Sequence, residues 1–411
     1  MIKILSEAIK IQTTYDVNKE NMPKLHSLIE KSFPLVNKYM EKTVVGQSLV
    51  YKLSGEGNPI MFCGHLDVVV ALPNDWANPP YEGIIDDKFL WGRGAIDCKN
   101  TVIGLLCAME SLLSDGFKPT RTIYLSFGHD EEIGGPEGAH NIVEMLKSEG
   151  VRLDLVLDEG GHIATDFLEG RNYATIALAE KNILRLKLTA FDKGGHAAYI
   201  SGKTGLYRLS KAICAIEENP MPVKIIPLIQ KYIDTLGESY PQLVENFEEK
   251  PENSPFVRTT IAPTMISASK APNILPNEPN LVCDIRMLPS EKVEDVIAHI
   301  ENLVKDFNIT IEILDQPKGE GTATDFNADF YKFVESLIKE KFDDAIVVPA
   351  LMAGGTDARH YEQICDVVLR FMPVLMNNDI HKTLHAANER ILISSFDKAI
   401  DFYKTFIKRH G

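Results

Sequence analysis

The sequence lacks the features that mark secreted, disulfide-linked or membrane-spanning proteins. Its six cysteines form no Cys-x-x-Cys pair, and several lie in apolar runs, where a free thiol behaves as a small hydrophobic group. No stretch approaches the roughly 18 apolar residues of a membrane helix, and the opening residues 1–7 contain no long apolar signal segment. These absences predict a cytoplasmic protein with reduced cysteines and no membrane span.

Positive charge is also in short supply. The 43 lysines and arginines are outnumbered by 58 aspartates and glutamates, which gives a net charge of −15. An acidic chain repels phosphate backbones and anionic lipids, so we expect neither nucleic acid nor a membrane surface as a partner. The composition, 45% hydrophobic and 25% charged over 411 residues, is that of a globular protein long enough for two or three domains.

The sequence does contain a series of histidines and carboxylates, each at the end of an apolar, strand-like run or in a glycine-rich turn. In chain order these are His65, Asp67, Asp97, Glu131, Glu132, Asp158 and His385. Each has an ordinary interpretation alone: a polar strand end, an exposed Glu-Glu pair, a turn aspartate or a surface histidine. Their joint occurrence is typical of a hydrolytic site that binds two metal ions.

The chemistry of such a site suggests roles for the metal ligands. Asp97 is the candidate bridge, because each of its two oxygens can bind one ion. His65 and Asp158 would complete one zinc site, and Glu132 and His385 would complete the other.

A two-metal site also needs a proton carrier and oriented ligands. Neighbours in sequence point in different directions, so Glu131 can face the attacking water as a base while Glu132 faces a metal. Asp67 stands two residues after His65, on the same face of an extended segment. Its carboxylate can therefore accept the second ring N–H of His65 and orient the imidazole.

Seven strings of the sequence resemble the motifs of the M20 metallopeptidase family, and the resemblance runs from about residue 5 to the C-terminus. The strings are Gly64-His-Leu-Asp67, Trp91-Gly-Arg-Gly-Ala-Ile-Asp-Cys-Lys99, Gly128-His-Asp-Glu-Glu132, Leu157-Asp-Glu-Gly160, Gly194-Gly-His196, Gly354-Gly-Thr-Asp-Ala-Arg359 and His385-Ala-Ala-Asn-Glu389. The Gly-His-Asp-Glu-Glu form is most similar to the branch that holds carboxypeptidase S and the aminoacylase-like N-acyl-amino-acid hydrolases.

The resemblance implies an α/β fold: a zinc-peptidase-like catalytic domain with an inserted ferredoxin-like α+β lid, which often makes the protein a homodimer. It implies two zinc ions per subunit, held by the five ligands named above, with Glu131 as base. It also implies a cis peptide bond between Asp97 and Cys98. Cobalt or manganese can occupy the same kind of ligand set.

Hydropathy patterns support this division of the chain. We expect the catalytic domain in residues 1–180 and 316–411, and the lid or dimerisation domain in residues 181–315. The catalytic parts should hold helices at 22–42, 100–113 and from 395, and strands at 44–53, 59–63, 122–127, 153–157, 345–348 and 367–371. The lid should follow the order β-α-β-β-α-β, at 182–189, 206–217, 261–267, 280–288, 291–306 and 309–314, with a helical insertion at 220–256.

The resemblance also implies substrate contacts from the lid. His196 would donate to the developing oxyanion, often in the neighbouring subunit's site. Asn273 and Arg286 would hold a carboxylate, for which arginine offers two parallel N–H donors. Arg359 is a second candidate for that carboxylate. The alternatives are that Arg286 pairs with Asp284 on its own strand and that His196 is an ordinary loop residue.

These observations predict a zinc-dependent hydrolase of amide bonds next to a free α-carboxylate, in short peptides or N-acyl amino acids. Two other functions stay open. An aminopeptidase or dipeptidase would read a free amine with an acidic residue such as Glu159, and a non-catalytic binding protein would keep only the fold. The sequence leaves the choice among carboxypeptidase, aminoacylase and dipeptidase open.

Overall fold

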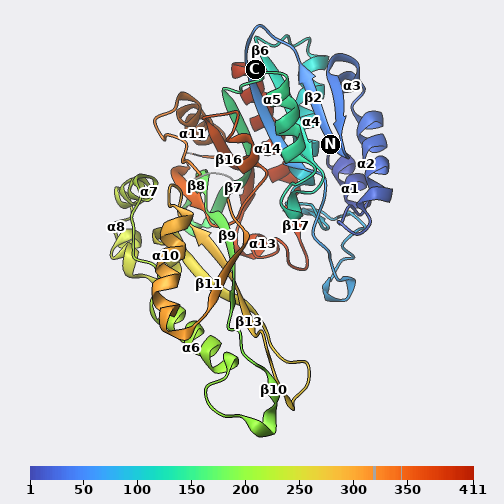
Figure 1. Cartoon of the computed structure of the whole chain (residues 1–411). Helices are drawn as coiled ribbons and strands as arrows, with labels where there is room; N and C mark the ends of the chain where they lie inside the picture. The colour runs from blue at the N-terminus through green and yellow to red at the C-terminus, as the bar shows by residue number, and fades with distance from the viewer. Residues whose placement is uncertain (318–320, 344) are drawn as a thin grey trace. The chain divides into compact units, whose positions relative to one another are not determined.

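The computed structural model describes residues 1–317, 321–343 and 345–411 (Figure 1). Its contacts divide the chain into two compact units. The main unit is Met1–Leu178 with Thr324–Gly411, and the inserted unit is Ala179–Ala323. The sequence predicts these boundaries after residues 180 and 315. Each unit has its own sheet and its own core, and each is described by itself.

The main unit is built on an eight-stranded mixed sheet in the order β1-β2-β6-β3-β7-β16-β8-β15. Its strands are β1 (Glu41–Val45), β2 (Ser48–Leu53), β3 (Gly57–His65), β6 (Arg121–Gly128), β7 (Leu155–Leu168), β8 (Arg171–Glu180), β15 (Ile346–Met352) and β16 (Val368–Met376). The central strands β6, β3, β7 and β16 run parallel, so their carboxyl ends lie at one edge. Ligands of open α/β sheets bind at that edge.

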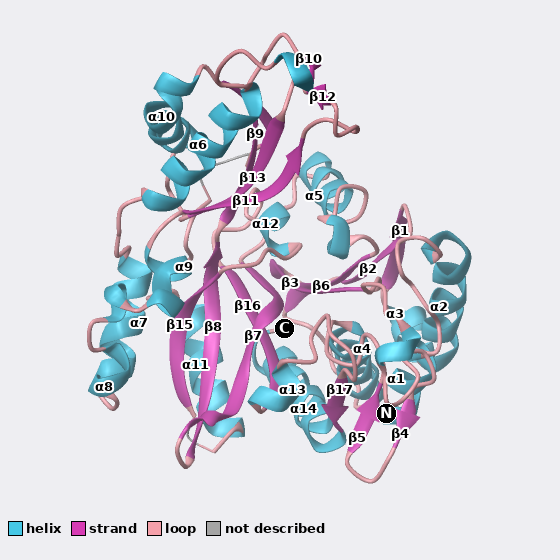
Figure 2. Ribbon diagram, turned by 90° about the horizontal axis from the view of Figure 1, so that it is seen from below, coloured by secondary structure: helices cyan, strands magenta, loops and turns pink. Residues whose placement is uncertain are grey.

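Helices cover both faces of this sheet. They are α1 (Ile2–Ile9), α2 (Asn18–Ser32), α3 (Pro34–Tyr39), α4 (Lys99–Ser114), α5 (Ala139–Ser148), α11 (Asp329–Lys341), α12 (Ala358–Tyr361), α13 (Asn378–His381) and α14 (Ile393–His410). On one face α5 and α12 share a core with strand residues such as Met61 and Val156. On the other, α4 and α14 pack on the sheet, with the rings of Phe62 and Phe406 edge to face at 5.1 Å. Figure 2 shows the strands between these two sets of helices.

Two predictions near the N-terminus are corrected by the structure. The predicted helix at 22–42 is two helices, because Pro34 has no backbone N–H and starts α3 immediately after α2 ends. The predicted strand at 44–53 is a hairpin. Gly46, with φ of +61°, supplies the left-handed residue of the tight turn between β1 and β2.

A small three-stranded sheet links two segments that are distant in sequence. It contains β4 (Ile84–Ile85), β5 (Phe89–Trp91) and β17 (Arg390–Leu392). Strand β17 lies beside β5 (Figure 2). The two strands pair antiparallel, with Trp91 opposite Arg390. The loop before β17 is therefore held beside the loop that follows β5.

The inserted unit has a four-stranded antiparallel sheet in the order β11-β13-β9-β14. Its elements are β9 (Asn182–Thr189), β10 (Gly195–His196), α6 (Gly205–Glu218), α7 (Pro227–Gly237), α8 (Pro241–Val244), α9 (Ser254–Val257), β11 (Thr260–Ser267), β12 (Ile274–Leu275), β13 (Asn280–Met287), α10 (Val293–Val304) and β14 (Thr310–Asp315). Helices α6 and α10 bury one sheet face against residues such as Leu186 and Ile285. This is the predicted ferredoxin-like arrangement, and the predicted fold class is confirmed.

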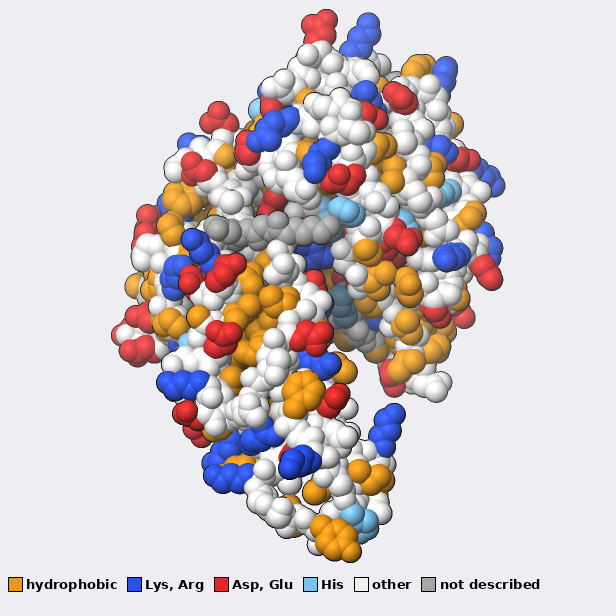
Figure 3. Space-filling view, in the orientation of Figure 1, with side chains coloured by type: hydrophobic (Ala, Val, Ile, Leu, Met, Phe, Trp, Pro, Cys, Tyr) orange, Lys and Arg blue, Asp and Glu red, His pale blue; other side chains and the backbone are white. Residues whose placement is uncertain are grey.

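The surface carries charge of both signs. Acidic and basic side chains are interspersed over the face drawn in Figure 3, even though the chain as a whole has a net charge of −15. Among the described residues, no helix combines the length and the apolar character needed to cross a membrane.

Candidate metal centre

Most of the candidate residues of the main unit meet at the carboxyl edge of its sheet. His65 is the last residue of β3, and Glu131 and Glu132 open a 3₁₀ turn three residues after β6. Asp97 lies two residues before α4, and His385 lies between α13 and β17. Because β3 and β6 are parallel neighbours, their ends bring these loops together.

The carboxylate of Asp97 spans two imidazoles. Its Oδ1 lies 2.9 Å from Nε2 of His65, and its Oδ2 lies 2.9 Å from Nε2 of His385. The peptide bond between Asp97 and Cys98 is cis. A carboxylate that reaches a different imidazole with each oxygen has the form needed to bridge two cations.

The two adjacent glutamates occupy different places around Asp97. Glu132 Oε2 lies 3.4 Å from Nε2 of His385, and donor atoms of His65, Asp97 and Glu132 all lie within 4.8 Å of one another. Glu131 Oε2 is 4.0 Å from Nε2 of His65. Glu132 therefore belongs to the group of possible metal donors, while Glu131 lies outside that group but near His65.

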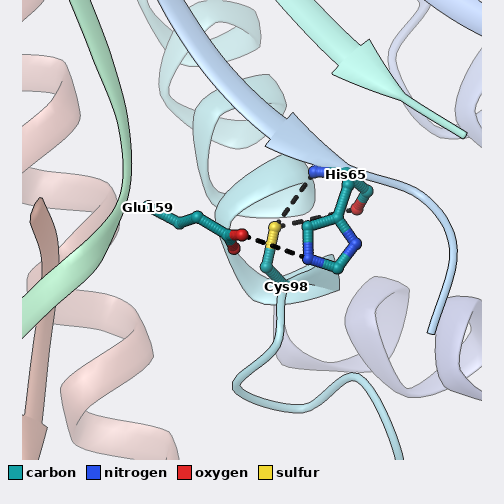
Figure 4. Close-up of side chains that lie close together, drawn as sticks. All are labelled: His65, Cys98 and Glu159. Carbon is teal, nitrogen blue, oxygen red and sulfur yellow. Dashed lines mark hydrogen bonds and ion pairs between the residues drawn. The ribbon is translucent and has the colours of Figure 1, made fainter. Parts of the chain in front are cut away.

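A second group of possible donors surrounds His65 (Figure 4). Glu159 of β7 places Oε1 3.3 Å from Nε2 of His65, and the thiol of Cys98 accepts the His65 backbone N–H at 3.0 Å. The other oxygen of Glu159 is buried and has no hydrogen-bond partner among the described residues. Such an oxygen, beside an imidazole and a bridging carboxylate, fits a bound cation.

Asp158, the predicted ligand, is the residue next to Glu159. Its Oδ1 accepts the backbone N–H of Glu159, and its charge raises the pKa values of Cys63 and Asp357 beyond the effect of burial. A β-bulge at this point of β7, where Arg370 pairs with Asp158 and Phe371 with Gly161, directs the two carboxylates to different neighbours. Glu159 is the one that lies against His65, and a role for Asp158 as ligand stays a prediction.

The electrostatics of the centre favour a bound cation. Burial, with the nearby charge of Asp97, raises the pKa of Glu132 to about 8, and burial raises that of Glu131 well above its ordinary value. The hydrogen bond to Asp97 raises the pKa of His385 to about 9. Burial opposes ionisation of Asp97, but the hydrogen bonds from His385 and His65 keep its pKa well below normal. A divalent cation would supply the positive charge that protons otherwise provide.

Asp67 holds the glutamate loop. Nδ1 of His65 lies 2.9 Å from the Asp67 carbonyl oxygen and 3.4 Å from its carboxylate, so the carbonyl is the closer acceptor. The Asp67 carboxylate instead accepts the backbone N–H groups of Glu131 and Glu132, at 3.2 and 3.1 Å. This contact links both glutamates to the strand end that carries His65.

The Gly-Gly-Thr-Asp-Ala-Arg segment packs on the same loop. A Cβ atom on Gly128 or Gly135 would lie 2.3 Å from a carboxylate oxygen of Asp357, which explains why glycine flanks the glutamate pair. Arg359 donates to the carbonyl oxygen of Gly134 at 3.0 Å. In this structure the guanidinium of Arg359 therefore supports the loop, and its predicted contact with a substrate carboxylate stays a prediction.

The candidate residues of the inserted unit are solvent-accessible. His196 and Asn273 lie on adjoining segments, because β10 pairs with β12 and the Ala197 backbone N–H donates to the Asn273 carbonyl oxygen. Nδ1 of His196 accepts the Ala198 N–H at 3.1 Å. In the neutral imidazole the proton is then on Nε2, where it can be donated to a ligand.

Arg286 lies apart from these two residues, on the open face of the sheet. Its Nε donates to Asp284 Oδ1 at 2.6 Å, and Asp284 also pairs with Arg185. The alternative considered from the sequence, a pair within the strand, is thus present in the structure. This contact uses Nε of Arg286, so a substrate carboxylate would approach the two Nη groups of the guanidinium.

Two residues with no role assigned from the sequence, Arg93 and Glu389, are buried beside the centre, with 2% and 0% of their surface exposed. Both residues lie inside motif strings that carry the family resemblance, so the sequence did mark them as candidates. Their hydrogen bonds join the Asp97 loop to the His385 loop. Composition and spacing could not indicate this contact, because the two residues are 296 positions apart.

The parallel sheet edge, the carboxylate shared by two imidazoles and the adjacent glutamates fit a metal-dependent hydrolase of peptide or amide bonds. The sequence model of peptidase family M20/M25/M40 matches residues 61–409. The chain therefore belongs to this peptidase family, and the family predicted from its motifs is confirmed.

Relatives with assigned names agree with this class. The chain is 31% identical to the probable carboxypeptidase S-like 2 of Dictyostelium discoideum, over 96% of this chain and 80% of the relative. It is 30% identical to the N-fatty-acyl-amino acid synthase/hydrolase PM20D1 of Xenopus tropicalis, over 99% and 85% of the two chains. Hydrolysis of amide bonds in peptides or acyl amino acids is the activity that both the family and these relatives support.

A solved structure supports the fold. An M20 family metallo-carboxypeptidase from Sulfolobus solfataricus superimposes with a TM-score of 0.77 at 18% identity, covering 99% of this chain and 98% of the other. At that identity the likeness concerns the fold alone. The predicted peptidase fold with an inserted domain is confirmed by this comparison.

Proposed function

We propose that the protein uses two divalent metal ions, natively zinc, to hydrolyse an amide bond next to a free α-carboxylate. The observation that carries this proposal is the Asp97 carboxylate, with one oxygen 2.9 Å from each of two imidazoles. His65 with Glu159 or Asp158 would hold one ion, and Glu132 with His385 the other. The nitrogen and oxygen donors suit zinc and also accept cobalt or manganese.

When bound, such a pair of ions polarises the scissile carbonyl and makes water acidic near neutral pH. The residues of the chain supply the proton transfers. Glu131 is close to His65 but outside the tight donor group, so it can take a proton from the attacking water and deliver it to the leaving nitrogen. Its raised pKa suits a group that must both accept and release a proton.

The inserted unit would supply the remaining substrate contacts. His196 presents Nε2–H as a donor for the oxyanion, with Nδ1 occupied by the Ala198 N–H. Arg286 and Asn273 would bind the α-carboxylate, and Arg359 is the alternative cation. The free-amine function is less well supported, because Glu159 lies 3.3 Å from His65 and is not open to a substrate amine.

Apolar side chains beside the centre favour N-acyl amino acids among the possible substrates. Val70 and Leu72, shortly after the His65–Asp67 segment, are 60% and 66% exposed, and Ile133 next to Glu132 is 48% exposed. The Val69 N–H donates to Glu132 Oε1 at 3.2 Å, which places this loop against the metal donors. An apolar acyl group would find contact area there.

We also propose a homodimer in the cytoplasm. The edge strand β11 of the inserted unit exposes Met265 (66%) and Ile266 (59%), and unpaired edge strands with apolar side chains favour pairing with another chain. All six cysteines are free thiols and five are buried, which suits a reducing compartment. Sedimentation of the purified protein tests the dimer.

The test of the substrate class is a matched set of substrates. Zinc-loaded protein would be incubated with N-acyl amino acids and dipeptides, and with the same compounds amidated at the α-carboxylate. We expect release of free amino acid from the carboxylate forms only, because an arginine guanidinium binds a charged carboxylate more strongly than a neutral amide. Equal rates on the amidated forms would remove the carboxylate contact from the proposal and favour a function that reads the amine.

A further inference from the structure

The carboxylate of Glu389 is saturated by donors from one short segment. Its Oε1 accepts the backbone N–H groups of Ile96 and Asp97, at 2.7 and 3.1 Å. Its Oε2 accepts the Gly94 N–H at 3.2 Å and Nη1 of Arg93 at 2.6 Å. The side chain of Glu389 is completely buried. Four donors on one carboxylate fix the path of the irregular chain that ends at Asp97.

Arg93 completes the connection in the opposite direction. Its Nη2 donates to the carbonyl oxygen of Ala386, the residue after His385, at 3.1 Å. The guanidinium carbon also lies 5.3 Å from the centre of the Trp76 ring. The Gly92 N–H donates to the Glu389 carbonyl oxygen at 2.9 Å, so side chains and backbone hold the same two segments together.

We propose that Glu389 and Arg93 are positioning residues that set the separation of Asp97 and His385 before any metal binds. The inference rests on the two-metal function proposed above, because Asp97 is its bridge and His385 one of its terminal ligands. Glu389 acts through the Asp97 backbone, and Arg93 through the backbone beside His385. Neither side chain needs to touch a metal or a substrate for this role.

A purely structural role is the competing explanation, and the energetics of buried pairs make the choice testable. A buried ion pair costs desolvation energy that its Coulombic attraction only partly returns, so stability alone is a weak reason to keep one. Groups that orient metal ligands from behind have a measurable second effect: removing them commonly lowers metal affinity or activity by roughly 10–100-fold.

The test is the Glu389→Gln variant of the full-length protein. Glutamine keeps the shape but offers one oxygen, so either the Ile96–Asp97 donors or the Arg93–Gly94 donors would face an N–H₂ group. Zinc binding by the metal-free protein would be measured by calorimetry, and the absorption spectrum of the cobalt-loaded protein would report ligand geometry. We expect zinc affinity to fall by about 10–100-fold and the cobalt bands to shift.

The matched control is Glu110→Gln. The Glu110 carboxylate also accepts two backbone N–H groups, those of Leu35 and Val36 at 2.8–3.0 Å, but it caps α3 instead of a ligand loop. This variant should lose thermal stability with no change in zinc affinity. If Glu389→Gln behaves in the same way, losing stability alone, the positioning role is wrong.

Arg93→Lys gives a second reading if the glutamine variant does not fold. Lysine keeps the charge beside Glu389 but cannot donate to Glu389 and Ala386 at once in the fork geometry of arginine. We expect a smaller loss of zinc affinity than for Glu389→Gln, and unchanged affinity would contradict the proposal. Because zinc binding is measured without substrate, a wild-type protein that binds two ions and hydrolyses nothing would overturn the proposed function alone.

Discussion

The candidate residues of the two units are held in different ways. In the main unit, His65 and Glu389 are buried, Asp97 is largely buried and His385 is about half exposed, yet each has a partner within the same cluster. In the inserted unit, His196 and Asn273 are exposed, and Arg286 is paired with a neighbour on its own strand. The main unit therefore has a preformed centre, whereas the inserted unit presents groups whose partners would be substrate atoms.

The two units therefore differ in how strongly the packing of each residue constrains its function. Buried carboxylates that share hydrogen bonds are costly unless a cation or protons offset their charge, so their arrangement already implies a metal centre. An exposed hydrogen-bond donor loses little solvation energy in any orientation, so its position says much less about which ligand it binds. The predictions below test this contrast, from the largest expected effect to the smallest.

The largest effect is expected from Glu131→Gln in the main unit. Turnover should fall by about 10²–10⁴-fold, because the amide cannot take the proton from the attacking water. Zinc content and substrate binding should be unchanged, as measured by metal analysis and by calorimetry with an N-acyl amino acid. Glu137→Gln, an exposed residue of the same loop, is the control. Turnover that persists in Glu131→Gln would show that another group is the base.

Asp67→Asn should have the next largest effect. The amide offers an N–H₂ group to one of the two backbone N–H donors of Glu131 and Glu132, so the loop loses one of its hydrogen bonds. We expect turnover to fall about 10–100-fold with the zinc content preserved. The measurement is steady-state kinetics together with metal analysis. An unchanged kcat would mean that the loop is held by Arg359 and Asp357 alone.

Arg286→Lys tests the inserted unit. If the guanidinium binds the α-carboxylate, KM should rise about tenfold for carboxylate substrates, because lysine cannot form the paired hydrogen bonds. Arg185→Lys is the matched control, since Arg185 shares Asp284 on the same sheet. Equal small changes of KM in the two variants would mean that Arg286 only pairs with Asp284 on the surface. Arg359 would then be the remaining candidate for the carboxylate ligand.

The last prediction concerns folding stability instead of turnover or binding, and it compares one histidine from each unit. Burial, with the nearby His381, lowers the pKa of His162 from 6.5 to about 4. The folded state therefore resists protonation that the unfolded chain accepts, and the free energy of unfolding should fall as pH drops from about 6.5 to about 4, by up to about 3 kcal/mol. Urea unfolding of His162→Phe should lose this dependence. His299→Phe, at a partly exposed position of the inserted unit, should keep it.

Much of the centre could be predicted from the sequence, because it lies at strand ends. His65, Glu131 and Glu132 follow apolar runs in parallel strands, and such ends meet at one edge of a sheet. The choice between Asp158 and Glu159 depends on a β-bulge. Arg370 of β16 pairs with Asp158 and Phe371 with Gly161, so two extra residues of β7 are accommodated there. A bulge redirects side chains and has no reliable sequence signal.

Other features required long-range information. The role of Glu389 depends on a partner 296 positions away, and no local pattern reports such a contact.

The break at Pro34, in contrast, can be predicted from local sequence, because proline starts helices and interrupts them. The apolar periodicity on both sides of Pro34 predicts one continuous helix. The missing backbone N–H of Pro34 nevertheless separates α2 from α3.

The most direct test of the account is a crystal structure of the zinc-loaded protein with anomalous diffraction data at the zinc edge. We predict two peaks in each main unit, one on either side of the Asp97 carboxylate and roughly 3.5–4 Å apart. One peak should lie at His65 and the other between Glu132 and His385. A single peak, or peaks that do not contact Asp97, would contradict the two-metal centre.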